Sequence, residues 1–175
     1  MHLRPTLITP PPQTLMEIPN GAAGIAATLD AMRRAAQRGK LNPTVRQKAS
    51  EIIARVPEKA WGAQIAALHA FVRDRIMYIR DPVNVETVRE AERVLIDGVG
   101  DCDDKSVLLA SMLEATGHPA RFMAVGFEPG KFSHVYVEAL TGKPPREKWI
   151  ALESTEKVPA GWKPRNVRAR MKRHV

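Results

Sequence analysis

Residues 100–113 read Gly-Asp-Cys-Asp-Asp-Lys-Ser-Val-Leu-Leu-Ala-Ser-Met-Leu. Asp101 is a favoured N-cap residue, so a helix is expected to begin directly after it. The dense apolar side chains from Val107 onward predict that this helix is buried, and Gly117 is placed to end it. The only cysteine of the chain, Cys102, is therefore predicted to lie in the first turn of a buried helix.

This position gives Cys102 two opposing influences. The unpaired N–H groups and the dipole at a helix N-terminus stabilise a thiolate, the form that attacks carbonyl groups. The neighbouring carboxylates of Asp101, Asp103 and Asp104 raise the thiol pKa, so a cationic partner would be needed to offset them. A single cysteine is more often a small buried hydrophobe than a nucleophile, and both interpretations remain open on this segment alone.

The rest of the chain predicts helices first and strands afterwards. Apolar residues at helical spacing indicate three helices upstream: one near residues 25–39, one near 42–53, and a longer one after Pro57 with one apolar face over residues 65–76. A short helix is expected at 88–96. Three strands with turn residues between them are expected downstream, at residues 121–127, 134–140 and 149–153. The simplest arrangement is an α+β fold in which the 101–116 helix packs on a small antiparallel sheet.

Two of the predicted strands carry polar residues that can complete a catalytic site. His134 begins one strand and Glu153 ends the next, and the alternation of each strand directs both side chains away from its apolar face. A thiol, an imidazole and a carboxylate in this relation form a nucleophile, a base and an orienting acid. The alternatives are a surface histidine at a strand edge and a glutamate in a turn.

Composition limits the class of protein. With 175 residues, 44% of them hydrophobic and 26% charged, the chain fits one soluble globular domain. No apolar run reaches the length of a membrane span, and the N-terminus lacks the apolar core and cleavage site of a signal peptide. The single cysteine excludes an internal disulfide, and the five scattered histidines form no metal-binding pattern, so neither a metal nor another cofactor is expected. His69 is expected to be a helix-face residue.

The net charge of +8 is concentrated at the ends of the chain. Residues 157–175 contain seven basic and no acidic side chains, whereas residues 61–156 have a net charge of −4. We divide the chain into a proline-rich extended arm at 1–19, one domain at 20–162 and a basic tail at 163–175. The two ends could dock partner proteins, or the tail could simply be solvated. Nucleic-acid binding is not expected, because no aromatic stacking pattern or DNA-binding motif accompanies the charge.

Several of these motifs resemble the transglutaminase-like cysteine hydrolase superfamily, which is distantly related to papain-like enzymes. The resemblance covers residues 20–162 and is most specific in the Gly-Asp-Cys-Asp-Asp-Lys-Ser-Val-Leu-Leu run. Further matching segments are Arg80-Asp81-Pro82, residues 117–122, Ser133-His134-Val135 and Trp149–Glu153. The chain is most similar to the small stand-alone members of tailed phages and prophages.

The resemblance implies a papain/transglutaminase-like α+β fold and a cysteine peptidase or amidase with Cys102 as nucleophile, His134 as general base and acid, and Glu153 as orienting acid. Such proteins usually have Asp where this chain has Glu153. The backbone N–H of Cys102 would form part of the oxyanion hole, with Tyr78 and Asn84 as candidates for the second donor.

The expected reaction is hydrolysis of an amide or isopeptide bond, or acyl transfer, on peptidoglycan peptides or a virion protein. A phage origin would place the protein in the cytoplasm of the bacterial host during assembly. The alternative is a virion structural or assembly protein that keeps the fold with little or no activity and docks tail proteins through residues 1–19 and 163–175.

Overall fold

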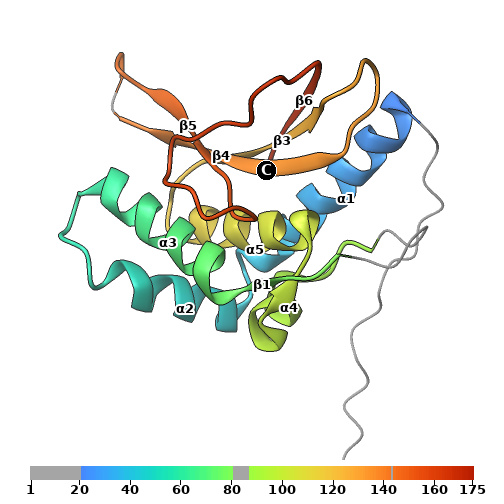
Figure 1. Ribbon diagram of the computed structural model, residues 1–175. Coiled ribbons are helices and arrows are strands. Elements are labelled where there is room, and N and C mark those ends of the chain that lie inside the picture. The colour runs from blue at the N-terminus through green and yellow to red at the C-terminus, as the bar shows by residue number, and fades with distance from the viewer. Residues whose placement is uncertain (1–20, 81–86, 143) are drawn as a thin grey trace, which may run out of the picture.

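The computed structural model describes residues 21–80, 87–142 and 144–175. The helices are α1 (Ala22–Gly39), α2 (Pro43–Ile53), α3 (Trp61–Arg75), α4 (Ala91–Asp97) and α5 (Cys102–Ala115). The strands are β1 (Met77–Tyr78), β2 (Val99–Gly100), β3 (Ala120–Gly126), β4 (His134–Thr141), β5 (Lys148–Leu152) and β6 (Ala169–His174). Figure 1 shows the sheet of β3–β6 as one layer, with α5 beneath it and further helices around α5. The α+β fold class predicted from the sequence is confirmed.

Helix α5 is the centre of the fold. It begins at Asp101, whose side-chain oxygen accepts the backbone N–H groups of Asp103 at 3.0 Å and Asp104 at 3.1 Å. Its C-terminal turn closes at Gly117, which has a φ of 82° that glycine adopts without strain. All residues from 104 to 113 are buried, because α5 packs against α1, α2, α3, α4 and the sheet. The buried helix predicted for this segment is therefore confirmed.

The main sheet has the antiparallel order β5-β4-β3-β6. Its apolar face, which includes Phe122, Val137 and Leu152, belongs to the same core as α5. The three predicted strands occur with bounds within one residue of those expected. The helix expected at 88–96 begins later, at Ala91, and the two-residue strands β1 and β2 were too short to leave a sequence pattern.

The basic C-terminal segment differs from the tail predicted for residues 163–175. Residues Ala169–His174 form β6, which pairs antiparallel with β3 from Arg121↔His174 to Gly126↔Ala169. Met171 is the only large apolar side chain on the inward face of this strand. A sequence in which basic residues are so frequent predicts a solvated tail rather than a strand. An edge strand tolerates this pattern because Arg170 and Lys172 remain exposed, while the inward-facing Arg173 pairs with Asp30 on α1 at 3.2 Å.

The outer face of the sheet has a small core of its own. Met123, Val125, Tyr136 and Ala151 are buried there, and Val167 packs against them. The segment between β5 and β6 packs on this face, and two backbone hydrogen bonds connect it to the sheet. Gly161 N–H donates to Ala151 O at 2.7 Å, and Arg168 N–H donates to Gly126 O at 2.8 Å.

Three sequence-based expectations lie outside the described residues: the arm at 1–19, the Asp81-Pro82 loop and Asn84. Within the part of the chain that the structure describes, no helix has both the length and the apolar character needed to cross a bilayer.

Candidate active site

Cys102 occupies the first position of α5, and the N-cap residue Asp101 separates it from the short strand β2. This strand runs parallel to β1 and places Gly100 opposite Tyr78. A Cβ atom on Gly100 would lie only 2.7 Å from the Cβ of Asp104, so the close approach requires glycine. Asp104 is fully buried and accepts hydrogen bonds from the Arg89 backbone N–H at 3.0 Å and from Arg89 Nε at 2.7 Å. These contacts fix the start of the helix that presents the thiol.

The environment of Cys102 keeps its thiol protonated. Burial raises the pKa of this group most strongly, and the carboxylates of Asp103 and Asp101 raise it further. The Sγ atom donates to Asp103 Oδ1 at 3.5 Å. The backbone N–H of Val135 hydrogen-bonds the sulfur and acts in the opposite direction, but the net effect on the pKa is upward. The sequence predicted that neighbouring carboxylates raise the thiol pKa, and Asp101 and Asp103 do so. The thiol therefore needs a base to ionise.

His134 and Glu153 form a close pair at the ends of neighbouring strands. His134 is the first residue of β4, and Glu153 follows the last residue of β5. The His134 Nε2 atom lies 2.5 Å from Glu153 Oε2, and the Glu153 side chain is 1% exposed. The other carboxylate oxygen, Oε1, accepts from the backbone N–H of Thr155 at 2.8 Å and from its Oγ1 at 2.7 Å.

These contacts favour an ionised carboxylate at Glu153. Burial on its own raises the pKa of Glu153, but the hydrogen bond and charge of His134, together with the two Thr155 hydrogen bonds, lower it below its ordinary value. The carboxylate is thus suited to accept a hydrogen bond from a neutral imidazole and to stabilise an imidazolium. Glutamate reaches both His134 and Thr155 from its position after β5.

The start of β4 brings this pair to the start of α5. Val135, the residue after His134, hydrogen-bonds the Cys102 sulfur through its N–H, and its carbonyl accepts from Ser106 Oγ at 3.4 Å. The three residues proposed from the sequence therefore gather at one corner of the molecule: His134 contacts Glu153, and the next residue contacts Cys102.

His69 is a further residue of this region whose role the sequence did not reveal. Expected to be a helix-face residue, it is 1% exposed, and its Nε2 lies 2.6 Å from the backbone carbonyl oxygen of Glu153. Burial is the main cause of a lowered pKa, so the imidazole is neutral and donates from Nε2. Its spacing from Ile65 and Val72 on α3 does predict burial, but nothing in the sequence identifies Glu153 as its partner.

Lys105 is a second buried group beside the site. It is 1% exposed, and its Nζ donates to the carbonyl of Ile76 at 2.6 Å and of Arg73 at 3.5 Å. These carbonyls lie at the C-terminal end of α3, where a cation is favoured. Burial lowers the pKa of Lys105 to about 8, against the opposing influence of Glu153 and Asp74.

Tyr78 lies on β1 opposite Gly100 of β2, and Gly100 precedes the nucleophile by two residues. Its side chain is partly exposed. Burial is the main cause of a raised pKa at Tyr78, so the phenol stays protonated near the thiol. Among the residues the structure describes, no three His, Cys, Asp or Glu side chains converge as metal ligands.

Comparisons with known proteins identify the family and the fold. Residues 46–154 match the model of the transglutaminase-like superfamily. No curated protein matches the chain. Among solved structures, the chain resembles a candidate cysteine protease from Cytophaga hutchinsonii, with a TM-score of 0.51 and 21% identity over 66% of this chain. It also resembles a candidate protease from Parabacteroides distasonis, with a TM-score of 0.52 and 18% identity over 74% of this chain.

A third similar structure is LapG of Legionella pneumophila, with a TM-score of 0.50 and 18% identity over 73% of this chain and 75% of LapG. The chain spans only 38% of the Cytophaga protein and 30% of the Parabacteroides protein. The family match covers more than half of the chain and defines the class of protein that the fold and site indicate. The chain belongs to the transglutaminase-like superfamily.

Proposed function

We propose that this protein is a cysteine hydrolase that acts on an amide or isopeptide bond through Cys102, His134 and Glu153. The observation that carries the proposal is the 2.5 Å contact between His134 and the buried Glu153, next to the strand residue that contacts the nucleophile. Fold similarity to proteins named as proteases supports the same chemistry.

The proposed reaction begins with proton transfer. Glu153 accepts the N–H of His134 Nε2, which leaves the Nδ1 atom to take the proton of Cys102. The thiolate then attacks the carbonyl carbon, and the oxyanion is held by the Cys102 N–H and the Tyr78 hydroxyl. The C–N bond breaks as the imidazolium gives its proton to the leaving amine, and a thioester remains. Water, activated by His134, hydrolyses the thioester and restores the thiol; an amine in place of water would give acyl transfer.

The proposed substrates are peptidoglycan peptides or a virion protein, in keeping with the resemblance to phage and prophage proteins. A bacterial host's cytoplasm during phage assembly is the corresponding location.

The decisive experiment is the pH dependence of Cys102 alkylation by iodoacetamide in the wild type and in His134→Ala. We expect the wild-type thiol to be alkylated faster than the thiol of His134→Ala at the same pH, because His134 takes the proton of a thiol whose own pKa is raised. Equal, slow alkylation in both proteins would remove the triad from the proposal. The Cys102→Ala variant should retain the fold and incorporate no label.

One observation favours the second candidate, a virion structural or assembly protein that keeps the fold without the reaction. The resting thiol has a raised pKa and donates to Asp103. Stoichiometric copies in purified particles, together with an unreactive thiol, would support this function; absence from mature particles would count against it.

A further inference from the structure

Thr155 holds one of the two oxygens of the Glu153 carboxylate. Its backbone N–H donates to Glu153 Oε1 at 2.8 Å, and its Oγ1 hydroxyl donates to the same atom at 2.7 Å. The other oxygen, Oε2, contacts His134 Nε2 at 2.5 Å. Thr155 and His134 therefore hold opposite oxygens of one carboxylate, and together they fix its plane.

The length of the Glu153 side chain makes this second point of attachment important. A glutamate has several rotatable bonds, so a contact with His134 alone would leave its carboxylate free to turn. The side chain is 1% exposed, and burial by itself disfavours the charged form. A hydrogen bond from the Thr155 hydroxyl stabilises that charge and selects one orientation of the group.

The segment that carries Thr155 is attached to α3 at both of its ends. His69 Nε2 lies 2.6 Å from the Glu153 carbonyl oxygen, and Arg73 Nη1 donates to the Val158 carbonyl at 2.9 Å. His69 and Arg73 are one helical turn apart on α3, so they lie on the same side of the helix. Figure 1 shows the chain after β5 running beside α3 before it turns back toward β6. The backbone around Thr155 is therefore held in place by the helix rather than only by its own loop.

We propose that Thr155 is a positioning residue of the site: its hydroxyl holds the Glu153 carboxylate so that Oε2 faces His134 Nε2. The imidazole then keeps its proton on Nε2 and offers Nδ1 to the thiol of Cys102. Thr155 acts only through Glu153 and needs no contact with the bond that reacts. The proposal rests on the proposed function and deepens it, because it names the residue that makes a long acid side chain effective there.

The pH profile of the reaction is a readout that a purely structural role would not move. Titratable side chains of β4, α3 and α5 interact with the charge of Glu153, namely His134, Tyr136, His69 and Lys105. Substitutions at Thr155 alter none of these groups. The Thr155 hydroxyl lowers the pKa of Glu153, so its removal raises that pKa. Because the reaction needs the ionised carboxylate, the acid limb of the rate profile should then move to higher pH.

The test is single-turnover acylation of Cys102 by p-nitrophenyl acetate, with the rate measured across the acidic and neutral pH range. Thr155→Val removes the hydroxyl and keeps the shape of the side chain and the backbone N–H. We expect its rate at neutral pH to fall about tenfold, the ordinary effect of losing a hydrogen bond to a charged group. Thr155→Ser keeps the hydroxyl and should stay within about threefold of the wild type, because it loses only the β-branch that limits rotation.

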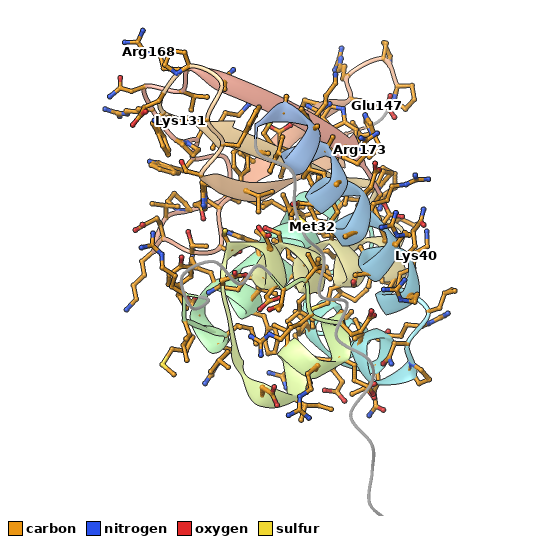
Figure 2. The ribbon with its side chains drawn as sticks, turned by 90° about the vertical axis from the view of Figure 1, so that its right-hand side faces the viewer. Met32, Lys40, Lys131, Glu147, Arg168 and Arg173 are labelled. Carbon is orange, nitrogen blue, oxygen red and sulfur yellow. The ribbon has the colours of Figure 1, made fainter. Side chains whose placement is uncertain are left out.

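Thr44→Val is the matched control. Thr44 Oγ1 donates to Glu92 Oε1 at 2.8 Å, which is a hydrogen bond between the same two groups at an exposed place between α2 and α4. Figure 2 shows Lys40, just before α2, and Lys131, in the hairpin that leads into β4, on opposite sides of the molecule. We expect Thr44→Val to keep the wild-type rate and the wild-type pH profile.

A double-mutant cycle tests whether Thr155 acts through Glu153. In a Glu153→Ala background, Thr155→Val should have no further effect on the rate, because the hydroxyl has lost the group that it positions. Equal losses in the two backgrounds would overturn the assignment of Thr155. If Thr155→Val does not fold, Thr155→Ala removes the same hydroxyl and is measured in its place.

The outcomes for the triad and for Thr155 are distinguishable. Slow acylation in His134→Ala, together with a wild-type rate and profile in Thr155→Val, would overturn the role of Thr155 and support the triad. A wild-type rate in His134→Ala would overturn the proposed function, and the role of Thr155 with it. Slow acylation in both variants, with the acid limb of Thr155→Val at higher pH and rescue by Thr155→Ser, is the expected result.

Discussion

The imidazole of His69 on α3 holds the backbone carbonyl of Glu153 at 2.6 Å, while the Glu153 side chain holds His134. His69 therefore fixes the position of Glu153 through a hydrogen bond to its main-chain carbonyl rather than to its carboxylate. We expect His69→Phe to lower stability by about 1–3 kcal/mol, because it leaves a buried carbonyl without its donor. It should also move the pH profile of Cys102 alkylation, because Glu153 moves relative to His134.

His118 offers a matched control for this prediction. It is also buried, burial likewise lowers its pKa, and its partner is Gln64 Oε1 at 3.2 Å. His118→Phe should lower the melting temperature without moving the alkylation profile. The same change of profile in both variants would show that His69 has no special relation to Glu153.

Glu153→Gln tests whether the carboxylate or only its shape is needed. The amide oxygen of the new side chain can accept a hydrogen bond from either Thr155 or His134, and the NH2 group then faces the other residue. An NH2 group that faces His134 needs an acceptor there, which favours the His134 tautomer with an unprotonated Nε2. In a well-studied serine protease the equivalent change lowers kcat by about 10⁴, and we expect a loss of about 10³-fold or more in single-turnover acylation by an activated ester. Glu153→Asp should lose less, because it keeps the charge. A rate within about threefold of wild type in Glu153→Gln would contradict the assigned role.

Asp103→Asn should make Cys102 more reactive. Asp103 accepts a hydrogen bond from the thiol and raises the pKa of Cys102 by its negative charge, and the neutral amide removes that charge while its carbonyl can still accept the S–H. The alkylation midpoint should move to lower pH, and the rate at neutral pH should rise about tenfold for each whole pH value by which the midpoint falls. Glu147→Gln, an exposed change distant in the chain, serves as the charge control. An unchanged midpoint in Asp103→Asn would show that the charge of Asp103 does not set the reactivity.

Arg89→Ala should be among the most damaging substitutions that do not touch the proposed triad. It would leave the fully buried carboxylate of Asp104 without the Nε donor at 2.7 Å, which costs about 3–5 kcal/mol. Arg93→Ala breaks a more exposed pair with Asp97 and should cost less than about 1 kcal/mol. Urea unfolding of the two variants measures the difference, and similar costs would contradict the structural role of Arg89.

Lys105 should give the protein a distinctive pH dependence. An unfolded lysine keeps its proton to about pH 10.4, whereas burial lowers the folded pKa to about 8. Between these values the unfolded state binds more protons, so the Lys105 contribution makes the free energy of unfolding rise with pH. The difference in that free energy between wild type and Lys105→Met should therefore increase from about pH 7.5 to about 9.5. A pH-independent difference would show that Lys105 titrates normally.

The sequence predicted the parts of the molecule that local rules control. Asp101 as an N-cap, Gly117 after the buried helix and the alternation of β4 and β5 each follow from a few neighbouring residues. The gathering of Cys102, His134 and Glu153 in one corner was also expected from strand alternation and helix position. That part of the candidate site needed the assumptions that β4 and β5 are adjacent and that the start of α5 lies beside them, and the family resemblance pointed to the same three residues.

The unpredicted parts depend on contacts between distant segments. β6 became a strand because β3 offered an open edge, which is invisible within a segment rich in Arg and Lys. The buried Lys105 was not anticipated either, since its partner carbonyls lie 29 and 32 residues earlier in the chain. His69 contacts a main-chain oxygen 84 residues away, so no local pattern could reveal the pairing.

The enclosure of α5 has a consequence for motion. Helices and the sheet surround α5, so the nucleophile lies on the part of the chain that unfolds locally least often. The amide protons of α5 from Val107 to Leu113 should therefore exchange with solvent only when the whole domain unfolds. Adjustments that accompany substrate entry and product departure must then occur in the segments around Cys102, while the sulfur itself stays still. Heat inactivation and global unfolding should consequently coincide.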